Sequence, residues 1–173
     1  AFSTDFAGGP LGGTVYYVKY EGDAVQYFPL PLDTAFSIHG SAGYVHSYGG
    51  RDVPIYQKYF LGVINSIRGF ETRSISPVDD ATGDLIGGKG MFVLNAEFLF
   101  PLFTKQNVKG VLFFDAGNSY ASRLDFTDLR TGAGAGIRWF SPIGPLRLEL
   151  GFNLDRRIGE AGDQWDFTIG TMF

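Results

Sequence analysis

Few residues in this sequence have the type and spacing that covalent chemistry requires. Residues 83–89 read Gly-Asp-Leu-Ile-Gly-Gly-Lys, which is the spacing of a phosphate-binding loop. Gly90, however, stands where a Ser or Thr would hold Mg²⁺, and a period-two pattern follows where a helix is required. The two histidines, His39 and His46, have no Ser or carboxylate at a suggestive spacing, and Cys is absent. We therefore predict no enzyme, no cofactor and no metal site.

Two further patterns favour structural interpretations over chemical ones. The alternate glycines of 132–136 lie within a period-two segment, so they indicate close strand packing or room for a neighbour, not a dinucleotide-binding loop. Asp79, Asp80 and Asp84 could contact a divalent cation, but an exposed acidic loop fits them better.

Composition points to a β-protein whose outside is not water. The 173 residues include 14 Lys and Arg against 18 Asp and Glu, a net charge of −4, which gives no basic surface for nucleic acid. Aromatic residues make up 16%, glycine is enriched with 25 residues, and only 18% of residues are charged. No apolar run of about 18 residues exists, so no transmembrane helix is expected. The start, Ala-Phe-Ser-Thr-Asp, is not typical of a signal peptide.

Period-two alternation dominates the chain. In 145–155 every second residue is Leu or Phe, and the residues between them are polar or glycine, which is the strand pattern. We expect strands over 14–28, 33–47, 90–100, 110–118, 131–140, 145–155 and 165–173, and the tail of another over 1–7.

The connections between these strands alternate in length. Short breaks near 29–32, 101–107 and 141–145 alternate with longer ones near 48–88, 119–130 and 156–163. Short turns at one end and long loops at the other are typical of an outer-membrane barrel. We therefore predict an all-β fold, an antiparallel transmembrane β-barrel with about 7–8 strands present. The alternative is a soluble sandwich, but its second face would carry many Lys and Glu, whereas here it is often Gly, Ser, Asn or Asp.

The break at 48–88 is far longer than an idle loop of about 12–15 residues. It contains Tyr59-Phe-Leu-Gly62 and Ile67-Arg-Gly-Phe70, so it is too apolar to lie loose in water. The lumen of the barrel is the nearest cover for it.

At these motifs the sequence resembles the C-terminal part of the barrel of the BamA family of outer-membrane assembly factors. The stretch Ile67, Arg68, Gly69 and Phe70 matches the loop-six motif of that family. Four further segments match in the family's order: 95–101, 113–118, 136–146 and 167–173. The superfamily also includes two-partner-secretion transporters and organelle import barrels.

The resemblance implies that the loop-six arginine reaches acidic residues inside the barrel. Period two places Glu97 and Asp115 on the faces opposite their apolar neighbours, hence toward the lumen. We therefore predict an Arg68–Glu97–Asp115 cluster, because one guanidinium can serve two carboxylates. The alternative is that both acids merely line a wet lumen. Gly69 suits a close backbone approach to the wall.

The resemblance also assigns a role to the last strand. An aromatic C-terminus resembles the β-signal read by the assembly machinery, and this strand would form one lip of the lateral gate. The candidate signal residues are Trp165, Phe167, Ile169, Gly170 and Phe173, with Gly170 as the place where the strand could bend or unpair.

The family's periplasmic POTRA domains and the first strands of its barrel of about sixteen strands have no counterpart here, so we expect 1–173 to be a C-terminal barrel fragment. If about eight strands closed alone, 48–88 should lie outside or be disordered, since side chains fill so small a barrel. The implied function is folding and inserting other β-barrel proteins at the bacterial outer membrane. The implied partners are lipid, unfolded clients and periplasmic lipoproteins that bind through POTRA domains. Alternatives are a two-partner-secretion transporter and a small structural eight-stranded barrel.

Overall fold

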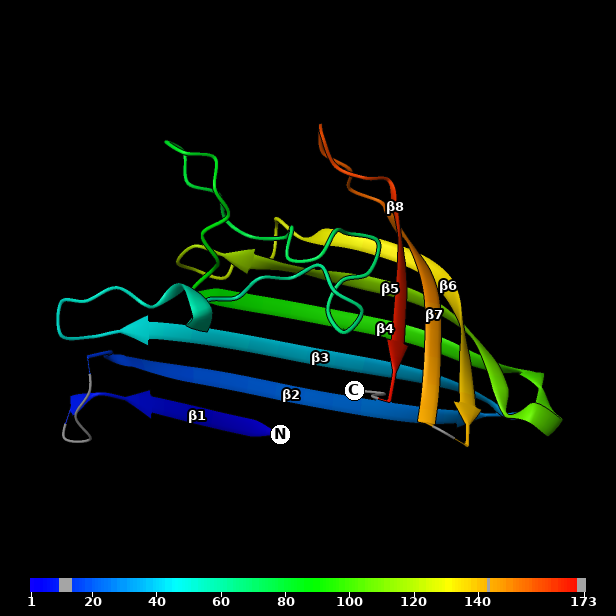
Figure 1. Ribbon diagram of the computed structural model, residues 1–173. Helices are drawn as coiled ribbons and strands as arrows, with labels where there is room; N and C mark the ends of the chain where they lie inside the picture. The colour runs from blue at the N-terminus through cyan, green and yellow to red at the C-terminus, as the bar shows by residue number, and fades with distance from the viewer. Residues whose placement is uncertain (10–13, 143, 171–173) are drawn as a thin grey trace.

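The chain forms one antiparallel sheet in which the order along the sequence is also the order in space. The computed structural model describes residues 1–9, 14–142 and 144–170. Each strand pairs with the next, from β1 to β8, and Figure 1 shows the sheet curling so that β6–β8 stand steeply against β2–β4. The bounds are β1 (Phe2–Ala7), β2 (Tyr17–Leu30), β3 (Thr34–Ser47), β4 (Gly90–Phe103), β5 (Val108–Tyr120), β6 (Arg130–Ser141), β7 (Gly144–Asn153) and β8 (Asp163–Ile169).

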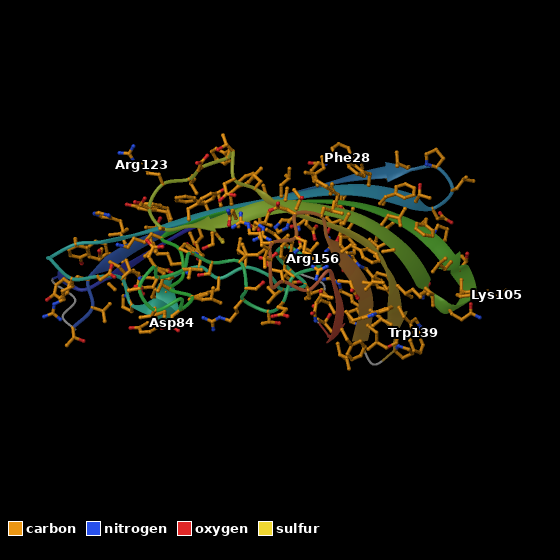
Figure 2. All side chains as sticks on the ribbon, turned by 90° about the horizontal axis from the view of Figure 1, so that it is seen from above. Phe28, Asp84, Lys105, Arg123, Trp139 and Arg156 are labelled. Atoms are coloured by element: carbon orange, nitrogen blue, oxygen red, sulfur yellow. The ribbon has the colours of Figure 1, made fainter. Side chains whose placement is uncertain are left out.

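The two faces of the sheet differ as the alternation in the sequence predicts. Strand pairing places Ile38, Phe114 and Phe152 in one row across the sheet, all on the outer face. These large apolar side chains are 38–48% exposed, although a soluble fold would bury them. Figure 2 gives a second view of the curvature, with Phe28 on the outer side and Asp84 on the other. The inner face carries glycines and charged residues instead.

The sheet does not close in the described part of the chain. Strands β1 and β8 are its two edges, and each pairs with one neighbour only. The expectation that residues 48–88 would lie outside or be disordered applied only to a closed eight-stranded barrel, so its condition is not met here. The segment between β3 and β4 lies on the inner face, because an open, curved sheet leaves room there that a closed eight-stranded barrel would not.

The core lies between this segment and the inner face. One cluster joins Leu61, Ile67, Phe70 and Ile75 of the segment to Val93 of β4. A second cluster packs Val53 and Tyr59 against Val45 of β3. The described helices are two 3-10 turns, η2 (Ile55–Gln57) and η3 (Thr104–Gln106), and neither is long and apolar enough to cross a membrane.

Candidate functional site

The segment between β3 and β4 is folded by backbone pairing within itself and is tied to the sheet by a side-chain hydrogen bond. Short antiparallel bridges join Tyr59 to Gly88 and Leu61 to Ile75, so the segment folds back on itself. The Ser119 hydroxyl of β5 donates to the Tyr59 carbonyl at 2.7 Å. These contacts bring residues 67–70 down onto the inner face.

Arg68 lies at the centre of the inner face and is only 1% exposed. Its Nε and Nη2 donate to the two oxygens of Asp115, both at 2.7 Å, and its backbone N–H donates to Asp115 at 3.0 Å. Its Nη1 donates to Glu97 Oε1 and to Glu149 Oε2, each at 2.7 Å. The guanidinium also lies 3.6 Å above the Phe113 ring. The structure thus brings together the three residues of the predicted cluster and adds a third carboxylate.

Sequence reasoning missed half of this network. Arg138 of β6 donates to Glu97 at 2.6 and 2.8 Å and to Glu149 at 2.9 Å. Arg147 of β7 donates to Glu149 at 3.1 Å and to Asn65 of the loop at 3.0 Å. The period-two pattern already placed these strand residues on the inner face, but nothing in the sequence indicates which charges on separate strands meet.

The network is balanced in charge and closed to solvent. Three guanidinium groups face three carboxylates, so no charge is left uncompensated among them. Every one of the six residues is at most 5% exposed. Removing one member of such a group leaves a buried charge without its partner and costs about 3–5 kcal/mol. The network therefore fixes the position of the loop on β4–β7.

Glycines make the close approach of the loop possible. A side chain at Gly132 of β6 would overlap the Arg68 carbonyl oxygen, and one at Gly151 of β7 would overlap the Gly69 backbone. Gly69 itself has a φ of +89°, and a Cβ there would lie 2.7 Å from the Phe152 backbone. Of the two interpretations of the alternate glycines, room for a neighbour applies at Gly132.

A second group of charges lies beside Phe70 of the loop. The Arg130 guanidinium stands 4.9 Å from the Phe70 ring and donates to Glu160 at 2.5 and 3.0 Å. It also pairs with Asp155 at 2.8 Å. Burial raises the pKa of Glu160, but hydrogen bonds, above all from Arg130, lower it to about 2. This group joins Phe70 to the segment between β7 and β8.

The candidate β-signal residues lie on the last strand and just after it. Trp165, Phe167 and Ile169 are 59–62% exposed on the outer face of β8. Gly170 ends the strand with a φ of +91°, and its N–H donates to the Pro145 carbonyl at 2.9 Å. Phe173 lies outside the described residues.

The other candidate sites have structural explanations. Residues 83–89 run directly into strand β4, with no helix to receive a phosphate. The Asp79 carboxylate accepts from the backbone of Ala81 and Thr82 in a turn. Within residues 1–9, 14–142 and 144–170, no cluster of three or more His, Asp or Glu side chains could hold a metal ion.

Comparison with known proteins finds relatives of this chain in both sequence and structure. The Omp85 superfamily domain model matches residues 1–173. The chain belongs to the Omp85 superfamily. The crystal structure of BamA from Haemophilus ducreyi lacking POTRA domains 1–3 superposes with a TM-score of 0.73 at 29% identity, over 88% of this chain and 34% of that one. The predicted all-β barrel class and the resemblance to the BamA barrel are both confirmed.

Two curated relatives of this chain, like the protein of that crystal structure, are named BamA. Outer membrane protein assembly factor BamA of Nitratidesulfovibrio vulgaris is 35% identical over 98% of this chain, and that of Neisseria meningitidis serogroup B is 26% identical over 94%. The chain spans 22% and 24% of their lengths, about a quarter or less. The relatives are named as assembly factors and not as enzymes, in agreement with the prediction of no enzymatic activity.

Proposed function

We propose that residues 1–173 are the C-terminal part of a transmembrane β-barrel in a bacterial outer-membrane factor that folds and inserts other β-barrel proteins. The observation that carries this proposal is the Arg68 network, which fixes an apolar loop on the inner face of a sheet whose outer face is apolar and exposed. A structural barrel has no need of such a loop. The names of the curated BamA relatives support the same assignment.

The proposed mechanism involves no covalent step. An unpaired strand edge is intolerable in lipid, because its N–H and C=O groups find no water. An edge such as that of β8 would therefore pair with a strand of an incoming client. Gly170, which follows β8 with a φ of +91°, is where this edge would bend or unpair, and a short seam there would thin the bilayer beside it.

The role proposed for the loop is to set the state of the barrel. Because Arg68 is bonded to β4, β5 and β7 together, movement of these strands relative to one another breaks buried contacts. The loop thereby keeps this part of the wall rigid while the edge opens. Clients, outer-membrane lipid and periplasmic lipoproteins bound through POTRA domains are the partners that this function implies.

The experiment uses the full-length protein carrying this chain, reconstituted in liposomes with an unfolded β-barrel client. The readout is the client's heat-modifiable gel mobility over time. We expect Arg68→Ala to slow client folding by at least tenfold, because a loss of about 3–5 kcal/mol exceeds the 1.4 kcal/mol of one decade. The matched control is Arg157→Ala, which removes a pair with Asp128 in which both side chains are more than half exposed.

Two outcomes would contradict the proposal. Equal client folding with wild type and Arg68→Ala would remove the loop from the mechanism. A protein that folds no client but exports a polypeptide partner across the liposome membrane would support the two-partner-secretion alternative.

A further inference from the structure

The inner row of β8, the red strand at the edge of the sheet in Figure 1, carries polar side chains that bond to no other element of the described chain. Gln164, Asp166 and Thr168 form this row, because each pairs in register with an inner-facing residue of β7. Asp166 has no hydrogen bond or ion pair with any residue in 1–9, 14–142 or 144–170. In the same ranges Thr168 Oγ1 is buried without a hydrogen-bond partner, and the Gln164 amide donates at 3.1 Å to the carbonyl of Trp165, its neighbour on β8.

Asp166 is an excess charge beside a balanced network. Its register partner on β7 is Glu149. The Glu149 carboxylate already accepts from three guanidinium groups, those of Arg68, Arg138 and Arg147. The network has as many carboxylates as guanidinium groups, so Asp166 adds a negative charge that no described cation contacts. A partly buried carboxylate in a barrel wall is costly unless a cation faces it.

The backbone of β8 is oriented to receive a further strand at its free edge. At one end of the β7–β8 ladder the Gly170 N–H donates to the Pro145 carbonyl at 2.9 Å. At the other end the Asn153 N–H donates to the Gly162 carbonyl, also at 2.9 Å. Because bonded and non-bonded pairs alternate in an antiparallel ladder, the even-numbered residues of β8 bond to β7. The N–H and C=O groups of the odd-numbered residues within 165–169 therefore face the free edge.

A strand added antiparallel to this edge comes closest to β8 at the inner row. The odd-numbered residues of β8 then form the hydrogen-bonded pairs, so Asp166 and Thr168 lie in non-hydrogen-bonded pairs. In such pairs the Cα atoms are about 4.5 Å apart and the side chains are nearest to each other. Opposite charges in this arrangement stabilise the pairing of strands, whereas like charges weaken it. A cationic side chain opposite Asp166 is therefore the complementary one.

We propose that Asp166 selects the strand that pairs with β8, by receiving a Lys or Arg side chain on the inner face of an antiparallel client strand. The inference rests on the proposed function, in which a client strand pairs with this edge. On its other face the same client strand presents apolar side chains to lipid, beside Trp165, Phe167 and Ile169, which are 59–62% exposed. The partner is thus an alternating strand that is apolar on one face and cationic at one position of the other.

The test captures strand peptides at this edge in the full-length protein in liposomes. Each peptide has about 11 residues, the length of a spanning strand, and alternates apolar with polar residues. The peptides differ at one inward position, which is Lys, Gln or Glu, and carry Cys two residues before it. Thr168→Cys supplies the matching thiol on β8 in a protein without other cysteines, and this chain contains none. The disulfide fixes the register, because it sets the variable residue of an antiparallel peptide opposite Asp166.

Two peptides compete in one sample under reversible thiol exchange, and mass spectrometry measures the ratio of their cross-linked products. We expect the Lys peptide to exceed the Gln peptide about two- to fivefold when Asp166 is present, and the Glu peptide to fall below the Gln peptide. Asp166→Asn should make the three yields equal. Asp166→Lys should reverse the order, and this reversal would also show that the variant folds and pairs.

Asp163→Asn is the matched control, because it makes the same chemical change at an exposed acid on the other face of β8. It should keep the order of the three peptides. Equal capture of the Lys and Gln peptides when Asp166 is present would overturn the inference, and so would a Lys preference that survives Asp166→Asn. Cross-linking of no peptide would mean that the protein's own wall keeps this edge, and would overturn the inference as well.

These outcomes are distinct from those of the client assay. If the peptides are captured without regard to charge while Arg68→Ala slows client folding, selection by Asp166 fails and the proposed function stands. If the charge preference is found but Arg68→Ala folds clients normally, the proposed function fails and the cation preference of the β8 edge remains.

Discussion

At the scale of single residues, the candidate site depends on how close the Arg68 backbone lies to the inner face of the sheet. A guanidinium reaches three carboxylates on different strands only if its backbone lies almost on the sheet. Gly132 and Gly151 permit this, because each presents no side chain to the loop backbone. The acids and the glycines are therefore two parts of the same binding surface for the loop.

We expect Gly132→Ala to displace the loop and to destabilise the protein by about 1–3 kcal/mol, since the added methyl group overlaps the Arg68 carbonyl. Urea unfolding of the reconstituted protein measures this loss. Gly40→Ala is the matched control, because the nearest atom to its added Cβ is a Leu94 methyl at an ordinary 4.0 Å. An equal shift of the midpoint in both variants would show that the glycines matter to their strands and not to the loop.

At the scale of elements, a second set of charges ties the connections together. Arg130 at the start of β6 contacts Phe70 of the loop and pairs with Glu160 and Asp155 of the segment between β7 and β8. Asn153 at the end of β7 also donates to Glu160 at 2.9 Å. The loop is thus held at Arg68 by buried charges and, two residues later, at Phe70 by Arg130, whose carboxylate partners are partly exposed.

The group of charges around Arg130 should be sensitive to acid. The pKa of Glu160 is lowered from 4.5 to about 2 in the folded protein, against the effect of burial and mainly by Arg130. Its stabilising contribution is therefore complete above pH 4.5 and is lost as the pH falls toward 2. We expect hydrogen-exchange protection of residues 154–162, corrected for intrinsic rates, to fall several-fold over this range.

Glu160→Gln should lack that fall, because its side chain does not titrate. Glu71→Gln, a change at an exposed acid of the loop, should retain it. If the Glu160→Gln protein loses protection over the same range as the wild type, another group controls the segment.

At the scale of the whole molecule, the sheet has two unlike faces and two open edges. The inner face is covered by the loop, and the outer face exposes large apolar side chains from β2 to β8. Water would make that outer face a liability, whereas lipid is its proper solvent. The chain covers 34% of a solved BamA structure, and under the proposed function these open edges would pair with further strands of a larger barrel.

A charge in the middle of the outer face tests the membrane orientation. Leu112 of β5 is 50% exposed there, and Leu112→Arg should cost about 2–4 kcal/mol in lipid. Thr104→Arg, in the η3 turn beyond the end of β4, should cost about 0–1 kcal/mol because it lies near the interface. Urea titration of both variants in lipid measures the difference. Equal costs would contradict a lipid-facing β5.

The sequence determined the strands and their faces by itself. Period two reports directly which side of a strand meets apolar surroundings, so the strands and the inward orientation of Glu97 and Asp115 could be predicted. The Ile67–Phe70 motif could be found too, because it is contiguous. Burial of the loop could be predicted as well, because residues 59–70 are too apolar to lie exposed to water.

Tertiary structure alone decided how those faces come together. Arg138, Arg147 and Glu149 join the network because strand register and sheet curvature bring distant positions into contact, and alternation within one strand contains no such information. The same holds for His39, whose partners lie 16 and 56 residues away. Whether the sheet closes was likewise undecided by the sequence, since closure depends on strand number and tilt in three dimensions.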